Sequence, residues 1–206
     1  MTRFFATIGT MSTEILIALS TFAFVASVTP GPNNLMLMSS GANYGIRRTL
    51  PHYFGVVFGF LLMIVLVGLG LIEVFGVYPF VYDILRYFSI AYLSYLAWKI
   101  ATSRPQVATA GSKPLSALQA ALFQWVNPKA WSMALTALTV YAPSQGLATV
   151  ALVAFICALV NMPSVFIWVV LGSRLQRLLG TDTRLRRFNY SMALILLATL
   201  YPVLVD

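Results

Sequence analysis

Apolar segments of membrane-spanning length recur along the chain, and the connections between them are short. A helix needs about 20 apolar residues to cross the hydrocarbon core of a bilayer. On that measure the chain divides into about six spans, at residues 15–40, 51–72, 80–100, 116–140, 148–171 and 188–205. Only 9% of the residues are charged, against about 25% in an ordinary soluble domain. We therefore expect an all-α membrane protein with a single transmembrane domain over residues 1–206.

The basic residues predict the orientation of these spans. The chain has 13 Lys and Arg against 5 Asp and Glu, a net charge of +8. Ten of the basic residues lie in or beside the first, third and fifth connections: Arg47, Arg48, Lys99, Arg104, Lys113, Arg174, Arg177, Arg184, Arg186 and Arg187. Because cytoplasmic loops are enriched in Lys and Arg, we expect these connections in the cytoplasm and both termini outside. No basic cluster lies on a soluble face, so the charge does not indicate nucleic-acid binding.

The chemically reactive residues give no sign of catalysis, of a metal or of a cofactor. Cys157 is the only cysteine, so the chain can form neither an internal disulfide nor a CxxC site. Paired carboxylates, a phosphate-binding loop, HExxH and GxSxG are all absent from the sequence. We therefore predict that the protein is not an enzyme.

The apolar run at 15–26 also has the length of a signal-peptide core. However, Glu14 precedes it where a signal peptide carries positive charge, so we favour a retained first span. Residues 1–10 add no clear element, and Met11 is an alternative start.

Two of the predicted spans contain strong helix breakers. TPGPNN occupies residues 29–34 in the first span, and WVNPKAW occupies 125–131 in the fourth. Proline removes a backbone donor and clashes with the carbonyl four residues back, so we expect both helices to be broken. Pro30 and Pro128 are 98 residues apart (128 − 30), close to half the chain. Because each half would hold three spans, an odd number, the spacing predicts two inverted three-helix repeats, about residues 11–100 and 115–206.

Matching broken helices of an inverted repeat meet near the bilayer centre, where they line a substrate site. The candidate substrate-binding residues are Pro30, Gly31, Pro32, Asn33, Asn34, Asn127, Pro128, Lys129 and Asn161. Two plainer explanations stay open, because prolines can simply kink membrane helices and asparagine amides can fasten helices together.

Lys129 is the one ionisable residue near the middle of a predicted span, where a charge costs at least about 2.5–3.5 kcal/mol. No Asp or Glu lies at the same predicted depth. The lysine must therefore be neutral, solvated in a cavity, held by free helix carbonyls, or paired with a group that is not part of the protein. A substrate carboxylate would serve as that group, and the positive end of a broken helix would favour the same anion.

Other features carry less weight. Gly55 and Gly59 form a GxxxG pair, which is typical of close helix packing. Asn161 and Pro163 are consistent with either a cavity lining or a hinge in the fifth span. His52 follows the inner arginines; a lone histidine is no metal site, and a role in protonation stays open.

Three stretches of the sequence, TPGPNN (29–34), WVNPKAW (125–131) and AYLSYLAWKIATS (91–103), resemble the LysE/RhtB family of bacterial amino-acid exporters. The resemblance covers nearly the whole chain and is strongest to the cysteine/O-acetylserine exporter branch. It implies efflux of amino acids or small derivatives through the inner membrane, driven by the proton gradient. The family motifs fall on Pro30 to Asn33 and on Asn127 to Lys129. Leu50-Pro51-His52 departs from the family pattern, which leaves the start of the second span open.

These observations together predict a secondary transporter that exports a small zwitterionic amino acid by alternating access. The bilayer and the substrate are its expected partners, nucleic acid is not, and self-association stays open. The rival hypothesis is a non-transporting assembly or scaffold protein whose prolines only shape the helix bundle. A channel is disfavoured, since neither a ring of charge nor a run of filter-like carbonyls is visible.

Overall fold

The structure, a computed structural model, describes residues 11–71, 77–78, 80–103, 113–142, 146–179 and 181–201. Within them it contains helices and no strand, which confirms the all-α prediction. Arg3, Glu73, Arg104 and most of the 103–114 connection lie outside the described residues. The helices are α2 (Thr13–Val28), α3 (Pro32–Leu66) with its π-helical extension η1 (Val67–Leu71), α5 (Phe80–Ala101), α6 (Ala117–Phe123), the 3-10 turn η2 (Gln124–Val126), α7 (Pro128–Tyr141), α8 (Leu147–Leu179) and α9 (Asp182–Ala198).

The long helix α3 is folded back on itself at Gly45, the one residue inside it with a left-handed φ, of 75°. The Ser40 and Thr49 hydroxyls lie 3.1 Å apart, whereas nine residues of straight helix would separate them by about 13.5 Å along the axis. Helix α3 therefore has a first leg, residues 32–44, and a second leg, residues 46–66. The predicted start of the second span at 51 was too late, since Pro51 lies inside the second leg.

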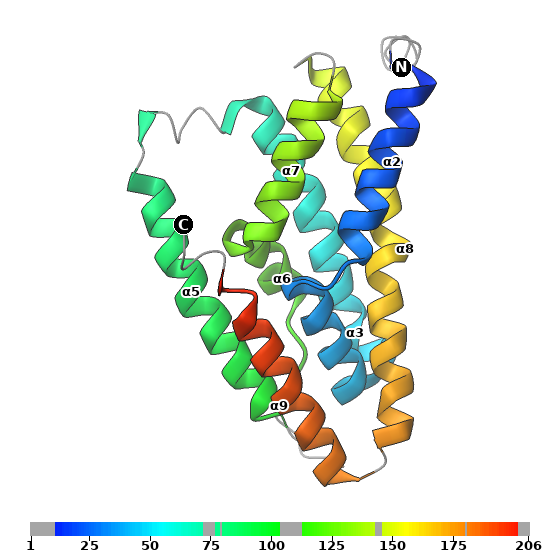
Figure 1. Cartoon of the computed structure of the whole chain (residues 1–206), viewed down its shortest axis with the longest axis vertical. Helices are drawn as coiled ribbons and strands as arrows, with labels where there is room; N and C mark the ends of the chain where they lie inside the picture. Colours follow the sequence, from blue (N-terminus) through cyan, green and yellow to red (C-terminus); the bar gives the residue numbers. More distant parts are fainter. Residues whose placement is uncertain are drawn as a thin grey trace.

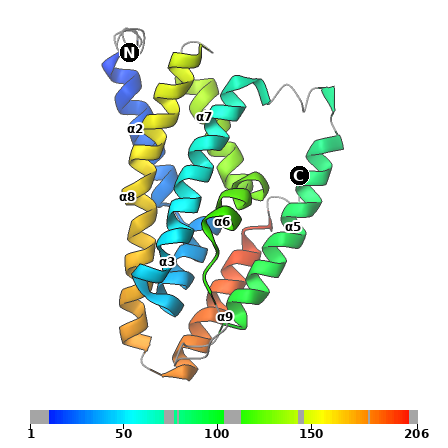
Figure 2. The same ribbon diagram turned by 180° about the vertical axis from the view of Figure 1, so that it is seen from behind.

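The elements run back and forth along the long axis of the molecule (Figures 1 and 2). From the end that bears the N-terminus, α2 and the first leg of α3 descend, and the second leg ascends beside them. Helix α5 then descends, α6 and α7 ascend, α8 descends and α9 ascends. The two breaks predicted from proline therefore lie inside a descending pass, between α2 and α3, and inside an ascending pass, between α6 and α7.

Glycines let the second leg of α3 pack closely against α6. A Cβ on Gly55 would collide with the backbone of Ala117, and a Cβ on Gly59 would lie 2.5 Å from the Cα of Ala121. The GxxxG pair therefore serves helix packing, as expected. The first leg approaches α8 in the same way, because a Cβ on Gly172 would collide with the carbonyl oxygen of Met38.

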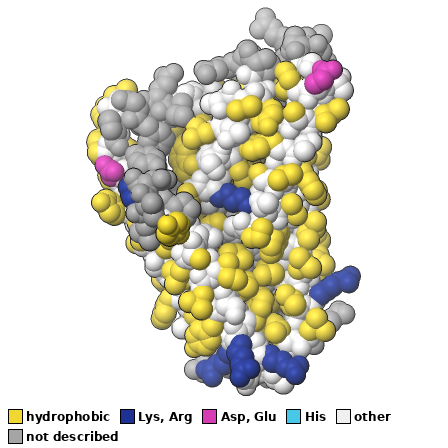
Figure 3. Space-filling model, viewed as in Figure 1, with side chains coloured by type: hydrophobic (Ala, Val, Ile, Leu, Met, Phe, Trp, Pro, Cys, Tyr) yellow, Lys and Arg dark blue, Asp and Glu magenta, His cyan; other side chains and the backbone are white. Residues whose placement is uncertain are grey.

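Two helices in the described part are long and apolar enough to cross a membrane, Pro32–Leu71 and Leu147–Leu175. Thr13–Val28 and Ala117–Val126 are apolar but shorter, because the two breaks divide the passes to which they belong. Large apolar side chains remain exposed on several helices, among them Phe58, Tyr87, Trp98, Phe155 and Leu194. Hydrophobic side chains accordingly cover much of the flank seen in Figure 3, and exposed apolar surface of that extent is typical of a membrane-facing protein.

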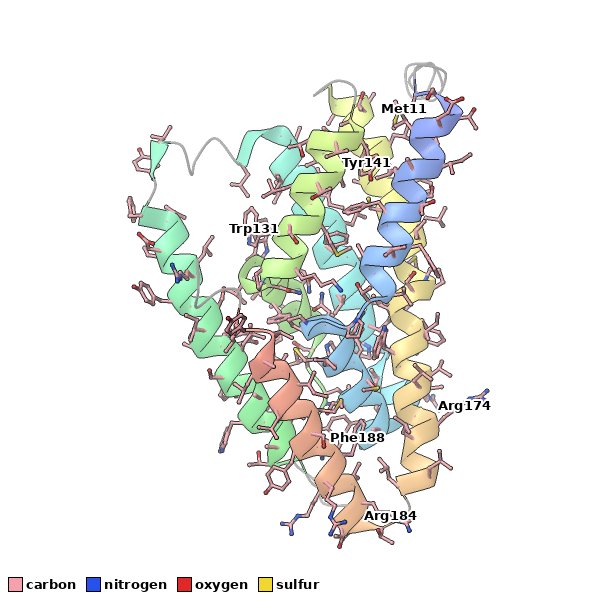
Figure 4. The ribbon with its side chains drawn as sticks, in the orientation of Figure 1. Met11, Trp131, Tyr141, Arg174, Arg184 and Phe188 are labelled. Carbon is pink, nitrogen blue, oxygen red and sulfur yellow. The ribbon has the colours of Figure 1, made fainter. Side chains whose placement is uncertain are left out.

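The charged residues separate along the same axis. Figure 3 shows Lys and Arg side chains gathered at the lower end of the molecule. In Figure 4 Arg184 lies at this lower end, whereas Met11 and Tyr141 lie at the opposite end. The end that is rich in arginine is therefore opposite the end at which α2 begins.

Candidate substrate site

The first break is a short extended segment between α2 and the first leg of α3. Thr29, with φ −66° and ψ 144°, ends α2, and Gly31, with φ −172° and ψ 175°, precedes α3. Pro32 then occupies the first turn of α3, where its missing N–H costs nothing and its fixed φ suits a helix. One proline of the PGP motif therefore starts a helix, and the interruption itself is confined to residues 29–31.

Every backbone carbonyl from Val25 to Gly31 accepts a hydrogen bond, although the helix stops at Val28. Asn34 donates from its amide to the carbonyls of Ser27 and Thr29, each at 2.7 Å. The indole of Trp168, on α8, donates to Val28 O at 3.2 Å. The remaining acceptors pair with the Thr29 N–H and hydroxyl, with the Leu35 N–H and with Lys129. Three different helices thus supply the donors that a continuous helix would have supplied from its own backbone.

Lys129, on α7, makes three hydrogen bonds to this break. Its Nζ donates to Thr29 O at 2.7 Å, to Thr29 Oγ1 at 2.9 Å and to Pro30 O at 3.3 Å. An ammonium has three donors, and all three are matched. The acceptors lie at the C-terminal end of α2, where the helix dipole favours a cation. Of the four states that the sequence left open for this lysine, the structure shows the one held by free helix carbonyls.

Gly31 leaves the room that the lysine side chain occupies. A Cβ at this position would lie 2.6 Å from Lys129 Cδ and 3.1 Å from Nζ. Because its φ is extended, the backbone itself would accept another residue, and the requirement for glycine is one of space. The lysine reaches the carbonyls of the first break by passing over this glycine.

The second break is shorter and is stabilised from within its own segment. Helix α6 tightens into the 3-10 turn η2, and Asn127 caps α7 by accepting from the Lys129 N–H at 3.2 Å. Pro128 is in the first turn of α7, as Pro32 is in that of α3. The indole of Trp131 donates to Trp125 O at 2.9 Å across the turn. The N-terminal ends of two helices, which carry partial positive charge, therefore face the same region from opposite directions (Figure 1).

A reciprocal amide pair joins the two breaks. Asn33 donates to Gln124 Oε1 at 2.9 Å, and Gln124 donates to Asn33 Oδ1 at 3.2 Å. Gln124 is fully buried and also donates to Ala120 O. The sequence prediction missed Gln124, although it lies in QWVNP directly before the second break. Its signal was an amide inside an otherwise apolar helix, the same signal that drew attention to Asn33.

Most of the candidate residues surround one small cavity. Its lining includes Ser27, apolar residues of α2, α3, α7 and α8, and six of the candidates: Gly31, Asn33, Asn34, Asn127, Lys129 and Asn161. Asn161 donates to Ser27 Oγ at 2.9 Å, and its buried Oδ1 has no partner within the described residues. The three prolines Pro30, Pro32 and Pro128 do not line the cavity; they shape the backbone around it. The cavity measures about 20 Å³, room for about one water molecule and far less than an amino acid needs.

The comparisons with known proteins agree on a family of transporters. The pattern of the LysE type translocator family matches residues 24–200. The cysteine/O-acetylserine efflux protein of Escherichia coli K12 is 30% identical over 188 residues, which is 90% of this chain and 95% of that protein. The protein of the same name from Escherichia coli O139:H28 is 30% identical over 189 residues, 91% of this chain and 96% of its own. No solved structure matches.

The helical fold, its apolar flanks and the two broken passes are those expected of a membrane translocator rather than an enzyme. The chain belongs to the LysE type translocator family, because the family pattern covers most of its length. The family resemblance seen in TPGPNN and WVNPKAW is thereby confirmed, as is the expectation of a membrane transporter without enzymatic activity.

Proposed function

We propose that the protein exports a small zwitterionic amino acid or a close derivative across the bacterial inner membrane by alternating access. The family and the relatives, which are cysteine/O-acetylserine efflux proteins, support this class of cargo. The observation that carries the proposal is Lys129, a cation held on the carbonyls of Thr29 and Pro30 beside the N-terminal ends of α3 and α7.

A zwitterion can exchange with this arrangement group for group. Its carboxylate takes the place of the carbonyls as the partner of Lys129, near two helix ends that favour an anion. Its ammonium takes the place of Lys129 on the carbonyls of Thr29 and Pro30, so no buried charge is left unpaired. The exchange separates α7 from the end of α2, and it requires the 20 Å³ cavity to widen. Substrate binding and helix movement are thereby coupled through one side chain.

The architecture that we propose is six membrane spans in two inverted halves, about residues 11–100 and 115–206, within one domain. Two features of the fold support it. Pro32 and Pro128 each stand in the first turn of the helix that follows a break. The first leg of α3 descends from its break whereas α7 ascends from its own, as opposite insertion of the two halves requires (Figure 1).

We further propose that the arginine-rich end faces the cytoplasm, that both termini lie outside, and that the proton gradient drives export. The separation of charge along the long axis supports this orientation. Cysteines introduced at the exposed positions Thr13 and Thr181 test it. In a Cys157→Ala background Thr13→Cys should react only with an impermeant reagent added outside, and Thr181→Cys only from the cytoplasm. Labelling of Thr181→Cys from outside would contradict this orientation.

Counterflow of labelled amino acid in liposomes tests transport itself. Purified protein should accelerate uptake of labelled cysteine only into liposomes preloaded with unlabelled cysteine, and decarboxylated cysteamine should not compete. A scaffold protein would give the same uptake as empty liposomes, and a channel would not need the preloaded substrate.

A further inference from the structure

A second cavity lies next to the first leg of α3, on the side of the proposed cytoplasm. It measures about 60 Å³, about three times the central one. The first leg of α3, the end of α5 and the segment before α6 enclose it. Its polar lining consists of Ser39, Ser40, Tyr44, His52, Lys99, Ser103 and Lys113. Two of these side chains are cationic, and no Asp or Glu of the described residues lines the cavity.

His52 is the most deeply buried of the polar residues that line this cavity. The side chain is only 2% exposed, and neither ring nitrogen has a hydrogen-bond partner within the described residues. Buried polar atoms are almost always paired in folded proteins, so two unpaired ring nitrogens in one cavity lining point to a ligand with polar atoms. A neutral imidazole offers one N–H donor and one acceptor to such a ligand. The lysines add ammonium donors, which suit an anion.

The two cavities follow each other along α3. His52 lines the second cavity and Val56 lines the central one, four residues further along the second leg, or about 6 Å along the helix axis. A buried apolar cluster that includes Leu37, Tyr53 and Val56 lies between the two cavities. Val56 lines the central cavity, and Leu115, which packs against the cluster, lines the second one. The Tyr53 hydroxyl ties this cluster to α8 by donating to Met162 O at 3.1 Å.

We propose that the second cavity is a cytoplasmic binding site for the carboxylate of the exported amino acid, occupied before the substrate passes to Lys129. Lys99 and Lys113 hold the carboxylate, and the His52 N–H completes its hydrogen bonds. The inference rests on the proposed function and on the orientation given above. It adds a first binding step, about one helical turn from the central site and separated from it by the apolar cluster.

His52 is the only histidine of the chain, which makes it a site-specific reporter. In protein labelled with ring-¹⁵N histidine and placed in nanodiscs of zwitterionic lipid, the imidazole gives a single set of ¹H–¹⁵N correlations. Reduced cysteine should shift these signals in a saturable way, whereas cysteamine, which lacks only the carboxylate, should not. The Lys99→Gln, Lys113→Gln double variant should weaken the cysteine affinity read from this shift at least about tenfold, since each charged partner is lost.

Arg184→Gln is the matched control, because it removes an exposed charge at the same end of the molecule without touching the cavity (Figure 4). It should bind cysteine as the wild type does. An unmoved His52 signal at saturating cysteine overturns the inference, as does an unchanged affinity in the double lysine variant. A shift produced by adding phosphatidylglycerol instead of cysteine would assign the cavity to a lipid headgroup, which also overturns it. Counterflow by the wild type is scored separately, so that a failure here is distinguishable from a failure of the proposed function.

Discussion

Each of the two breaks leaves backbone groups without helical hydrogen-bond partners, and the two breaks satisfy these groups in different ways. At the first break, residues 29–31, the exposed carbonyls are captured by Asn34, Trp168 and Lys129, which come from three helices. At the second, a 3-10 turn and the cap by Asn127 satisfy the backbone within the segment. The first break therefore depends on the position of α7 and α8, whereas the second is self-contained. We therefore expect the first break to be more sensitive to substitution than the second.

The largest effect is expected at Gly31, where the two breaks touch. Gly31→Leu should reduce transport at least about 100-fold while the protein still inserts, because the added side chain displaces Lys129 from its carbonyls. Counterflow normalised to inserted protein measures the loss.

A double variant separates lost space from other effects of this change. Gly31→Ala should destabilise the wild type, since even a Cβ meets the lysine, yet it should not destabilise Lys129→Ala, in which that space is free. Additive losses of stability in that cycle would show that the glycine serves something other than the lysine.

The amide pair between the breaks should have an intermediate effect. Asn33→Leu or Gln124→Leu alone should destabilise the folded protein by about 0.6–1.7 kcal/mol, as for other hydrogen bonds between membrane helices. Because the pair joins the breaks, each change should also slow transport several-fold. The double variant should lose less than the sum of the two single changes.

Asn43 and Asn189 provide the control for this prediction. They form a second reciprocal amide pair, at 2.9 and 3.0 Å, and neither lines the central cavity. Asn43→Leu should destabilise the protein by a similar amount while transport per folded molecule stays unchanged in counterflow. Equal losses of transport in both pairs would contradict a special role for the contact between the breaks.

The smallest effect is expected at the cap of the second break. Asn127→Ala removes the acceptor for the Lys129 N–H and should cost about 1 kcal/mol of stability. Since this break is satisfied within its own segment, transport per folded molecule should fall by less than about threefold. Asn127→Ser, which retains a capping oxygen, should restore stability in an unfolding titration. A transport loss as large as that of Gly31→Leu would remove the distinction between the breaks.

The sequence was sufficient to predict where the helices break, because proline and glycine act locally. Pro32 and Pro128 begin helices at the predicted places, and Lys129 was singled out by its charge alone. A connection between residues 40 and 51 was predicted, but not its form, because the turn depends on one left-handed residue, Gly45, between two helical segments. Gln124, Asn43 and Asn189 were missed for another reason. Their role depends on partners 91 and 146 residues away, and a single sequence does not show such pairing.

The same limit applies to Lys129. Its position inside an apolar segment was compatible with four states of the side chain: neutral, solvated, held by helix carbonyls, or paired with a group outside the protein. Only the spatial approach of Thr29 and Pro30, 100 and 99 residues earlier, selects the carbonyls. What remains a proposal is that a substrate carboxylate takes their place during transport.

The initial efflux rate of Lys129→Met, normalised to membrane-inserted protein, tests that claim most directly. Methionine keeps an apolar stem of similar length but deletes the charge, so the variant should insert at least as well as the wild type and lose carboxylate-dependent transport. Lys129→Arg keeps the charge and should retain some activity. That activity should be only partial, because a planar guanidinium does not fit the place of a compact ammonium. Export by Lys129→Met at the wild-type rate would show that the lysine only holds the first break together, and it would contradict the exchange of carbonyls for a substrate carboxylate.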